Sequence, residues 1–384
     1  MRKKTQKIMT FLTVCMLLLL AACSGESTES EGTSTESNGT INAKIGVVSY
    51  LTGAGAAYGE AITQGLKLAQ SEINEQGDVN IELVIEDSAG KADQALSASQ
   101  KLMSDDDLVA IIGPTLSTEF FAVAPEADLN GITIMGTSTT AEGIPEIGDY
   151  VFRNSIPEAL AIPTAMKKAV ERTGAKKVAM IYGNDDVLTQ SGFDTMKKTA
   201  EEMGLEITTI ETYQKGQSDY NAQLTKIKKS NPDLILASAL YNEGAVIMDQ
   251  ARKMGIEVPF VGGNGFNSPQ VIEIAGAASN GLIVATPWFG ESDETKVVEF
   301  NKKYEAEYGK LPDQFAAQAY DALYLYADAL KRAGEADREA FHEALAETKD
   351  YEGLLGNFSF DEIGDVVMDV KVVEIKDGKF IEFE

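Results

Sequence analysis

Short apolar runs alternate with amphipathic segments along most of the chain after residue 43. The apolar runs are rich in β-branched residues and end at glycine, proline or polar residues, a pattern typical of buried strands. The amphipathic segments repeat their apolar positions at a helical period, as Ile62, Leu66 and Ile73 do. In the first part of the chain the pattern predicts strands at 43–50, 80–86, 109–112 and 132–135, with helices from 58, at 91–103 and after 117. This alternation predicts a parallel, doubly wound sheet.

The same alternation starts again after residue 160. It predicts strands at 177–182, 206–212, 233–237, 260–262 and 281–285, with helices at 163–172, 190–203, 219–229, 243–254 and 268–275. Three successive helices then follow at 293–308, 315–333 and 337–348, before a strand-rich end at 366–375 and 379–383 around the hairpin signal Asp377-Gly378. Helices without strands of their own must cover an existing sheet. We therefore expect an α/β protein with two doubly wound, mainly parallel βα lobes, and a chain that crosses between them more than once.

Hydroxyl groups gather after two neighbouring predicted strands. Ser117 stands at the expected N-cap of a helix, after Gly113-Pro114 ends the run 109–112. The sequence Thr-Ser-Thr-Thr at 137–140 follows the run 132–135. Free N–H groups and partial positive charge at a helix N-terminus favour a small anionic group such as a carboxylate. The same residues also fit a capped helix followed by a polar loop that binds nothing.

The first forty residues differ in composition from the rest of the chain. Basic residues at 2–7 precede an apolar run at 9–20 that is too short to span a bilayer, so we expect residues 1–22 to be a signal peptide. The run ends in Leu-Ala-Ala-Cys, which resembles the bacterial lipobox, and Cys23 is the expected lipidation site. Ordinary secretory cleavage, with Cys23 as a bystander, is the alternative. Residues 23–42 are rich in Ser, Thr, Gly and Glu and predict a flexible tether.

Charge and composition exclude several classes of function. The chain has 33 basic and 60 acidic residues and a net charge of −27, so no nucleic-acid partner is expected. His342 is its only histidine and Cys15 leaves with the signal, which argues against His/Cys metal sites and against Cys–His or Ser–His–Asp nucleophiles. The sequence contains no nucleophile elbow or phosphate loop. We therefore expect no catalytic residue, no metal and no cofactor.

Five stretches carry a resemblance to a known family. They are IGVVSYLTGAGAAYGEAITQGLKLAQSEIN at 45–74, IIGPTLSTEFFAVAP at 111–125, ITIMGTSTT at 132–140, QARKMGI at 250–256 and QAYDALY at 318–324. From residue 43 to its end, the chain resembles the type I substrate-binding proteins of branched-chain amino acid (Leu/Ile/Val) ABC transporters. The resemblance implies a monomer with two lobes and three crossovers, near 154–157, 286–289 and 353–357. The lobes would comprise 43–156 with 289–355, and 157–288 with 356–384.

The resemblance also implies ligand contacts in the first lobe. Ser117 matches the serine whose hydroxyl and backbone N–H hold the ligand carboxylate. Ser138 and Thr140 match positions that hold the α-carboxylate and the α-ammonium, and Thr139 between them is included as a ligand contact. Tyr58 matches an aromatic position in the side-chain pocket.

The second lobe departs from the family pattern. Leu188 stands where the family often has a tyrosine, and a second tyrosine position falls on Leu240-Tyr241. The acidic residue that pairs with the ligand ammonium falls on Asn264, which is also a plausible turn residue between two glycines. A buried ammonium without an anion is costly, so either another carboxylate serves or the ligand is not a standard α-amino acid. The candidate carboxylates are Asp185, Asp186 and Glu243.

We therefore expect a lipid-anchored, extracytoplasmic protein that captures a small amino acid, branched-chain or apolar, between two lobes. The ligand would be delivered to the permease subunits of an ABC importer. A sensor that reports to a membrane receptor and a binder of a non-amino-acid carboxylate are the alternatives. Trp288 and Phe315 lie near predicted hinge or cleft segments and are candidates for an apolar wall, although aromatic residues more often belong to a core.

Overall fold

The computed structural model describes residues 39–383 of the chain. The predicted signal peptide, Cys23 and most of the predicted tether lie outside the described residues. Within the described part, the strands form a five-stranded sheet, a seven-stranded sheet and a small three-stranded sheet. The predicted α/β class with mainly parallel strands is confirmed.

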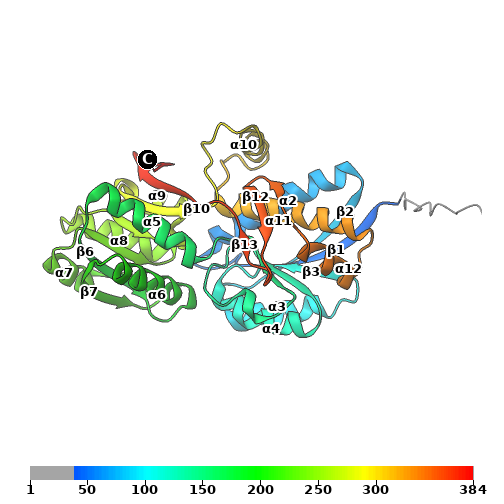
Figure 1. Cartoon of the computed structure of the whole chain (residues 1–384), viewed down its shortest axis with the longest axis horizontal. Helices are drawn as coiled ribbons and strands as arrows, with labels where there is room; N and C mark the ends of the chain where they lie inside the picture. Colours follow the sequence, from blue (N-terminus) through cyan, green and yellow to red (C-terminus); the bar gives the residue numbers. More distant parts are fainter. Residues whose placement is uncertain (1–38, 384) are drawn as a thin grey trace, which may run out of the picture. The chain divides into compact units, whose positions relative to one another are not determined.

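The first sheet is parallel and has the strand order β2-β1-β3-β4-β5. Its strands are β1 (Ile41–Ser49), β2 (Val79–Asp87), β3 (Leu108–Ile112), β4 (Thr133–Gly136) and β5 (Val151–Arg153). Its helices are α2 (Ala56–Gln76), α3 (Ala92–Met103), α4 (Ser117–Leu129), α11 (Gln314–Ala333) and α12 (Arg338–Ala346), with a short turn η1 (Pro145–Ile147). Helices α3 and α4 cover one face of the sheet, and α2 and α11 cover the other (Figure 1).

This arrangement follows from strands that are apolar on both sides. Ile111 of β3 packs in one cluster with α3 and α4, whereas its neighbour Ile112 packs in the other cluster with α2 and α11. Strands buried on both faces read as continuous apolar runs, as the sequence shows. The carboxyl ends of β1, β3 and β4 therefore lie at one edge, where ligands bind in sheets of this kind.

The second sheet has the order β15-β14-β10-β9-β8-β6-β7, in which β14 runs antiparallel to both of its neighbours, β10 and β15, and the other pairs are parallel. Its strands are β6 (Lys177–Gly183), β7 (Glu206–Tyr213), β8 (Leu234–Ser238), β9 (Phe260–Gly262), β10 (Leu282–Thr286), β14 (Lys371–Lys376) and β15 (Lys379–Glu382). Its helices are α5 (Glu158–Thr173), α6 (Val187–Glu202), α7 (Asn221–Ser230), α8 (Tyr241–Lys253) and α9 (Gln270–Ala275), with turns η2 (Asn264–Phe266) and η3 (Gly276–Ser279). Asp377 and Gly378 both have positive φ, at 51° and 76°, which confirms the predicted hairpin. Helix α10 (Thr295–Tyr308) follows β10.

The small antiparallel sheet contains β11 (Tyr351–Gly353), β12 (Gly356–Phe360) and β13 (Val366–Val367). It packs on the first sheet, because Phe360 meets Phe152 of β5 edge to face and Asp365 pairs with Arg153 at 2.6 Å. The crossover predicted near 353–357 therefore lies too early in the chain. Residues 356–367 stay with the first sheet, and the chain joins the second sheet only at β14.

Candidate functional site

The first loop of the site follows β3 and opens helix α4. Ser117 is the first residue of α4 and the N-cap position is Leu116, so the predicted capping role of Ser117 is wrong by one residue. The cap is made instead by Glu119, whose carboxylate accepts from the backbone N–H of Leu116 at 2.8 Å. The buried Ser117 hydroxyl is thereby left for another partner, and it accepts from the backbone N–H of Ala141 at 3.3 Å.

The second loop follows β4 and lies against the first. The Ser138 hydroxyl donates to the Thr115 carbonyl oxygen at 2.6 Å and holds the two loops together. Thr139 is fully buried and its hydroxyl lies against Gly136, where an added Cβ would be 1.9 Å away. Thr140 faces the other lobe, because its carbonyl oxygen accepts from the Glu158 backbone N–H at 2.8 Å. Thr139 is one of the four residues whose hydroxyls were predicted to contact the ligand. Its hydroxyl instead turns back toward its own strand.

Glu158 is the residue that the sequence analysis missed. It is the first residue of α5, directly after Pro157, and its side chain is only 1% exposed. Its Oε1 accepts from the Asn264 backbone N–H at 2.9 Å and lies 3.5 Å from the Thr140 hydroxyl. Its Oε2 is buried without a hydrogen-bond partner among the described residues. Burial raises the pKa of Glu158 to about 7, so a carboxylate here lacks the positive partner that would stabilise its charge.

Asn264 contributes to the site through its backbone. Its side-chain oxygen accepts from Gln314 Nε2 at 2.7 Å and from Asn267 Nδ2 at 3.4 Å. The amide oxygen is therefore already engaged by the protein, while the backbone N–H holds Glu158. Asn264, where the family resemblance led us to expect an acid, therefore orients Glu158 through its backbone.

An aromatic group from both lobes lies beside these polar residues. The Tyr58 hydroxyl donates to the Gly265 carbonyl oxygen at 2.5 Å and accepts from the Tyr241 backbone N–H at 2.9 Å. The Tyr58 ring packs edge to face on Tyr241 and Phe315, with centroid distances of 4.7 and 4.8 Å. Helix α2 approaches closely enough because Gly59 has no side chain: a Cβ there would lie 2.2 Å from the Tyr50 carbonyl oxygen. These rings form an apolar wall that joins the two lobes.

The remaining candidate residues lie at the start of α6. Leu188 is buried, and its backbone N–H donates to the N-cap residue Asp186 at 3.0 Å. Asp186 also accepts from the Thr118 hydroxyl at 3.2 Å, which joins α6 to α4. Each of the three carboxylates considered as an ammonium partner already accepts a backbone N–H of its own lobe. The distances are 2.9 Å for Asp185, 3.0 Å for Asp186 and 3.0 Å for Glu243.

Two further features were sought among the described residues: a metal site and a membrane-spanning helix. No group of three or more His, Cys, Asp or Glu side chains placed to hold a metal ion occurs between residues 39 and 383. No helix within the same residues combines the length and the apolar character needed to cross a bilayer.

Comparison with known proteins decides the family. The family described as periplasmic binding protein matches residues 42–379 of this chain. The chain belongs to the periplasmic binding protein family.

The relatives described here are 27% to 31% identical to this chain. A leucine-, isoleucine-, valine-, threonine- and alanine-binding protein of Pseudomonas aeruginosa is 30% identical over 334 residues, which cover 84% of this chain and 87% of the relative. The branched-chain amino acid transporter substrate-binding protein LivJ of Streptococcus pneumoniae, solved in complex with isoleucine, is 31% identical. Its TM-score is 0.83, with coverage of 89% of this chain and 97% of that chain. The leucine-binding protein LivK of Thermotoga maritima is 27% identical, with a TM-score of 0.82 and coverage of 88% and 97%. This periplasmic binding protein therefore shares the two-lobed fold of both solved structures.

Proposed function

We propose that the protein captures an α-amino acid with an apolar, branched side chain between its two lobes and delivers it to the permease of an ABC importer. Relatives named for binding leucine, isoleucine and valine support the ligand class. The arrangement of charge and apolar surface in the site supports it independently. In this proposal the protein binds its ligand and performs no catalysis.

The unpaired carboxylate oxygen of Glu158 is the observation that carries the proposal. A buried acceptor without a donor is costly, and a carboxylate without a cation is costlier still. A ligand ammonium placed at Glu158 Oε2 supplies both a donor and a positive charge. The Thr140 hydroxyl, 3.5 Å from Oε1, is close enough to share that ammonium.

The other end of the amino acid fits the two first-lobe loops. Ser117 lies at the N-terminus of the 13-residue helix α4, where N–H groups and partial positive charge favour a carboxylate. Ser117 and Thr140 lie on the two loops that the Ser138–Thr115 bond joins. A molecule held between them would present a carboxylate to one loop and an ammonium to Glu158, and an α-amino acid carries both groups.

The ligand side chain would meet the apolar wall. The wall consists of the rings of Tyr58, Tyr241 and Phe315. The hydroxyls of the two tyrosines are hydrogen-bonded to backbone carbonyl oxygens. Leu188 adds an aliphatic surface where related proteins often carry a tyrosine. A wall without a free charge favours aliphatic side chains over acidic or basic ones.

Contacts between the lobes support capture by closure. Besides the Tyr58 bonds, the Tyr241 hydroxyl donates to the Ala54 carbonyl oxygen at 2.7 Å, and the Glu142 backbone N–H donates to the Ser191 hydroxyl at 3.2 Å. A ligand that contacts both lobes shifts an open–closed equilibrium toward this closed arrangement. We further propose that Cys23 carries a lipid that anchors the protein at the extracytoplasmic face of the cell membrane. The tether would comprise the residues between Cys23 and β1, so it ends before Ile41 and not at residue 42 as the sequence predicted.

A binding panel tests the proposal. The purified protein is unfolded and refolded to remove any ligand it carries, and then titrated in a calorimeter with leucine, isoleucine, valine, aspartate and lysine. We expect one-to-one binding of at least one branched-chain amino acid and none of aspartate or lysine. If aspartate or lysine bound as tightly as the branched-chain amino acids, the role of the apolar wall would be contradicted. If none of the five amino acids bound, the proposed ligand class would be contradicted.

A further inference from the structure

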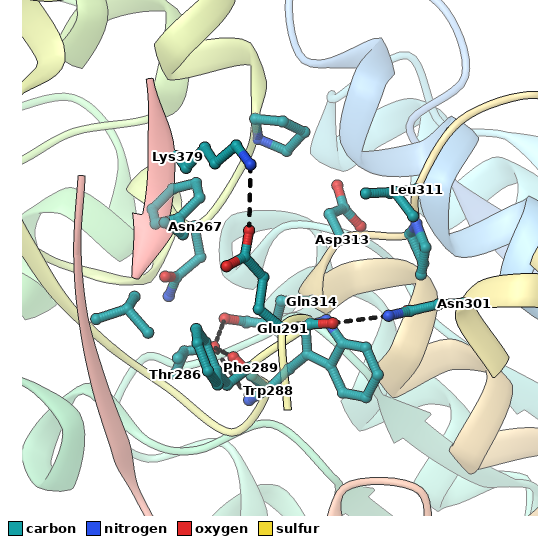
Figure 2. Close-up of a pocket in the computed structure, with 15 residues that line it drawn as sticks. Asn267, Thr286, Trp288, Phe289, Glu291, Asn301, Leu311, Asp313, Gln314 and Lys379 are labelled. Atoms are coloured by element: carbon teal, nitrogen blue, oxygen red, sulfur yellow. Dashed lines mark hydrogen bonds and ion pairs between the residues drawn. The ribbon is translucent and has the colours of Figure 1, made fainter. Parts of the chain in front are cut away.

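A cavity lies where the chain leaves the second sheet, apart from the site around Glu158 and Thr140 described above. Its volume is about 270 Å³, near the lower end of the range for small-molecule pockets. Five segments line it: the loop after β10, helix α10 through Asn301, the loop before α11, the β14–β15 hairpin and the loop after η2 (Figure 2). Because these segments come from both lobes, the cavity sits at a hinge.

The cavity is walled mainly by apolar side chains. The apolar residues are Pro269, Trp288, Phe289, Leu311, Pro312, Val373 and Phe380. The Thr286 hydroxyl fixes the position of Trp288, because it donates to the Trp288 carbonyl oxygen at 3.0 Å and accepts from its backbone N–H at 3.1 Å. The Phe300 ring packs edge to face against the indole of Trp288, with the ring centroids 5.6 Å apart. The aromatic wall is therefore held in place before any ligand arrives.

One negative charge in the cavity lacks a cationic partner. Asp313 caps α11, with its Oδ1 accepting from the Ala316 backbone N–H at 3.0 Å. No Lys, Arg or His among the described residues forms an ion pair with it, and the nearby Lys310 is paired with Glu60 at 2.7 Å. At the rim, Glu291 and Lys379 lie 4.0 Å apart and offset each other (Figure 2). The cavity thus combines a net negative charge with aromatic faces.

We propose that this hinge cavity is a second binding site, for an organic cation with an apolar body, such as an arylalkyl amine. Aromatic faces attract cations through their quadrupole, and the Asp313 carboxylate adds a formal charge. An anionic ligand of the same size meets repulsion from both. The apolar walls contribute binding energy for the carbon skeleton.

The site is separate from the amino acid cleft. Gln314 and Asn267 line the cavity, and their side-chain amides donate to Asn264 at 2.7 and 3.4 Å. Asn264 holds Glu158 on the other side of this polar layer. The hinge ligand is consequently a different molecule from the one held by Glu158.

Trp288 is the only tryptophan of the chain, so its fluorescence reports on the cavity directly. The purified protein is titrated with 2-phenylethylamine and, separately, with 3-phenylpropanoate, which has a similar shape and the opposite charge. We expect a saturable change of Trp288 emission with the amine and roughly tenfold weaker binding of the acid. A response that does not saturate, or equal affinity for the two probes, would overturn the proposal.

Four variants locate the binding. Asp313→Asn keeps a good helix cap and should remove the preference for the amine, whereas the matched cap variant Asp337→Asn on α12 should keep it. Phe380→Leu keeps an apolar wall without the ring and should weaken amine binding severalfold. Unchanged amine affinity in both cavity variants would overturn the proposal. Glu158→Gln should leave the Trp288 response intact, and its loss there would place the amine in the cleft instead.

Discussion

The single residue on which the site depends is Glu158. Its carboxylate touches the first lobe through Thr140 and the second through the Asn264 backbone, and one of its oxygens has no protein partner. Its surroundings disfavour a negative charge until a cation arrives. Asn264 stands where the resemblance led us to expect an acid, and we propose that Glu158 provides the negative charge instead.

Replacing this carboxylate with an amide should weaken amino acid binding strongly. Glu158→Gln preserves the size of the side chain but removes the charge that pairs with the ligand ammonium. We expect a loss of about 2–4 kcal/mol, roughly 30- to 700-fold in Kd, by calorimetric titration. Glu171→Gln, on the exposed side of the same helix, is the control and should bind normally. Equal affinity of the two variants would show that the ammonium lies elsewhere.

The raised pKa of Glu158 makes binding depend on pH. With a pKa of about 7 in the free protein, Glu158 is largely protonated below pH 7, and a ligand ammonium must displace that proton. Affinity should therefore be constant above pH 7 and fall toward about tenfold per pH unit below it, until the pKa of the complex is reached. Titrations near pH 6, in buffers of different ionisation enthalpy, should show release of about one proton. A flat profile in the wild type, or the same slope in Glu158→Gln, would rule out this group.

Part of the site follows from the sequence at this scale and part does not. Ser117 and Thr140 are predictable because strand ends, hydroxyls and a helix start lie within one short stretch of chain. Glu158 is not, because its partner Asn264 is 106 residues away and only the fold brings them together. The available signal was an acidic residue directly after a predicted crossover, which also describes an ordinary first helical turn.

At the scale of elements, helix α2 carries the main bridge between the lobes. The Tyr58 hydroxyl makes two hydrogen bonds to the second lobe while its ring stays packed against Tyr241 and Phe315. The bridge therefore combines directional bonds with apolar contact. The two hydrogen bonds and the contact with Tyr241 cross between the lobes, so they require the lobes to be closed, whereas the contact with Phe315 lies within the first lobe.

Removing only the directional bonds should speed ligand release. Tyr58→Phe keeps the ring and loses both bonds, and we expect affinity to fall by about 1–2 kcal/mol, roughly 5- to 30-fold. The loss should appear in the dissociation rate measured by stopped-flow, since the bonds form after the ligand has entered. Tyr324→Phe, whose hydroxyl bonds Glu72 within the first lobe at 2.9 Å, is the control. A dissociation rate unaffected in Tyr58→Phe would contradict a closing role for α2.

One ion pair, together with the Phe360–Phe152 contact, attaches the small sheet to the first lobe. Arg153 is 2% exposed and bonds Asp365 with two nitrogens, at 2.6 Å each, and the Ala141 carbonyl oxygen at 2.7 Å. Arg153→Met leaves Asp365 without its partner and should lower the free energy of unfolding by about 2–4 kcal/mol in denaturant titrations. Lys310→Met breaks a half-exposed pair and should cost about 1 kcal/mol or less. Similar losses in the two variants would show that the ion pair is not what attaches this sheet.

The elements themselves were largely predictable, with two exceptions. Runs of buried β-branched residues and the Asp-Gly turn identify the strands of both main sheets except β5, because their periodicity is local. Strand β5 has only three residues and was not predicted. The third sheet was not predicted, since β13 has only two residues and its attachment depends on the Arg153–Asp365 pair across 212 residues. The crossover predicted near 353–357 was placed too early in the chain for the same reason.

At the scale of the whole molecule, each of the two lobes contributes one part of the proposed recognition site. The first lobe supplies hydroxyls and a helix N-terminus, and α5 at the start of the second supplies the anion. An α-amino acid satisfies both parts at once and so favours the closed form. A carboxylic acid without the amine satisfies only the first lobe.

Calorimetric titration of the ligand-free protein with leucine and with 4-methyl-2-oxopentanoate tests this claim most directly. The two molecules share the carboxylate and the branched side chain and differ at the amine. We predict tight one-to-one binding of leucine and, for the keto acid, an affinity lower by about 2–4 kcal/mol because Glu158 is left unpaired. Equal or tighter binding of the keto acid would contradict the role of Glu158 and make the protein a carboxylate-binding protein.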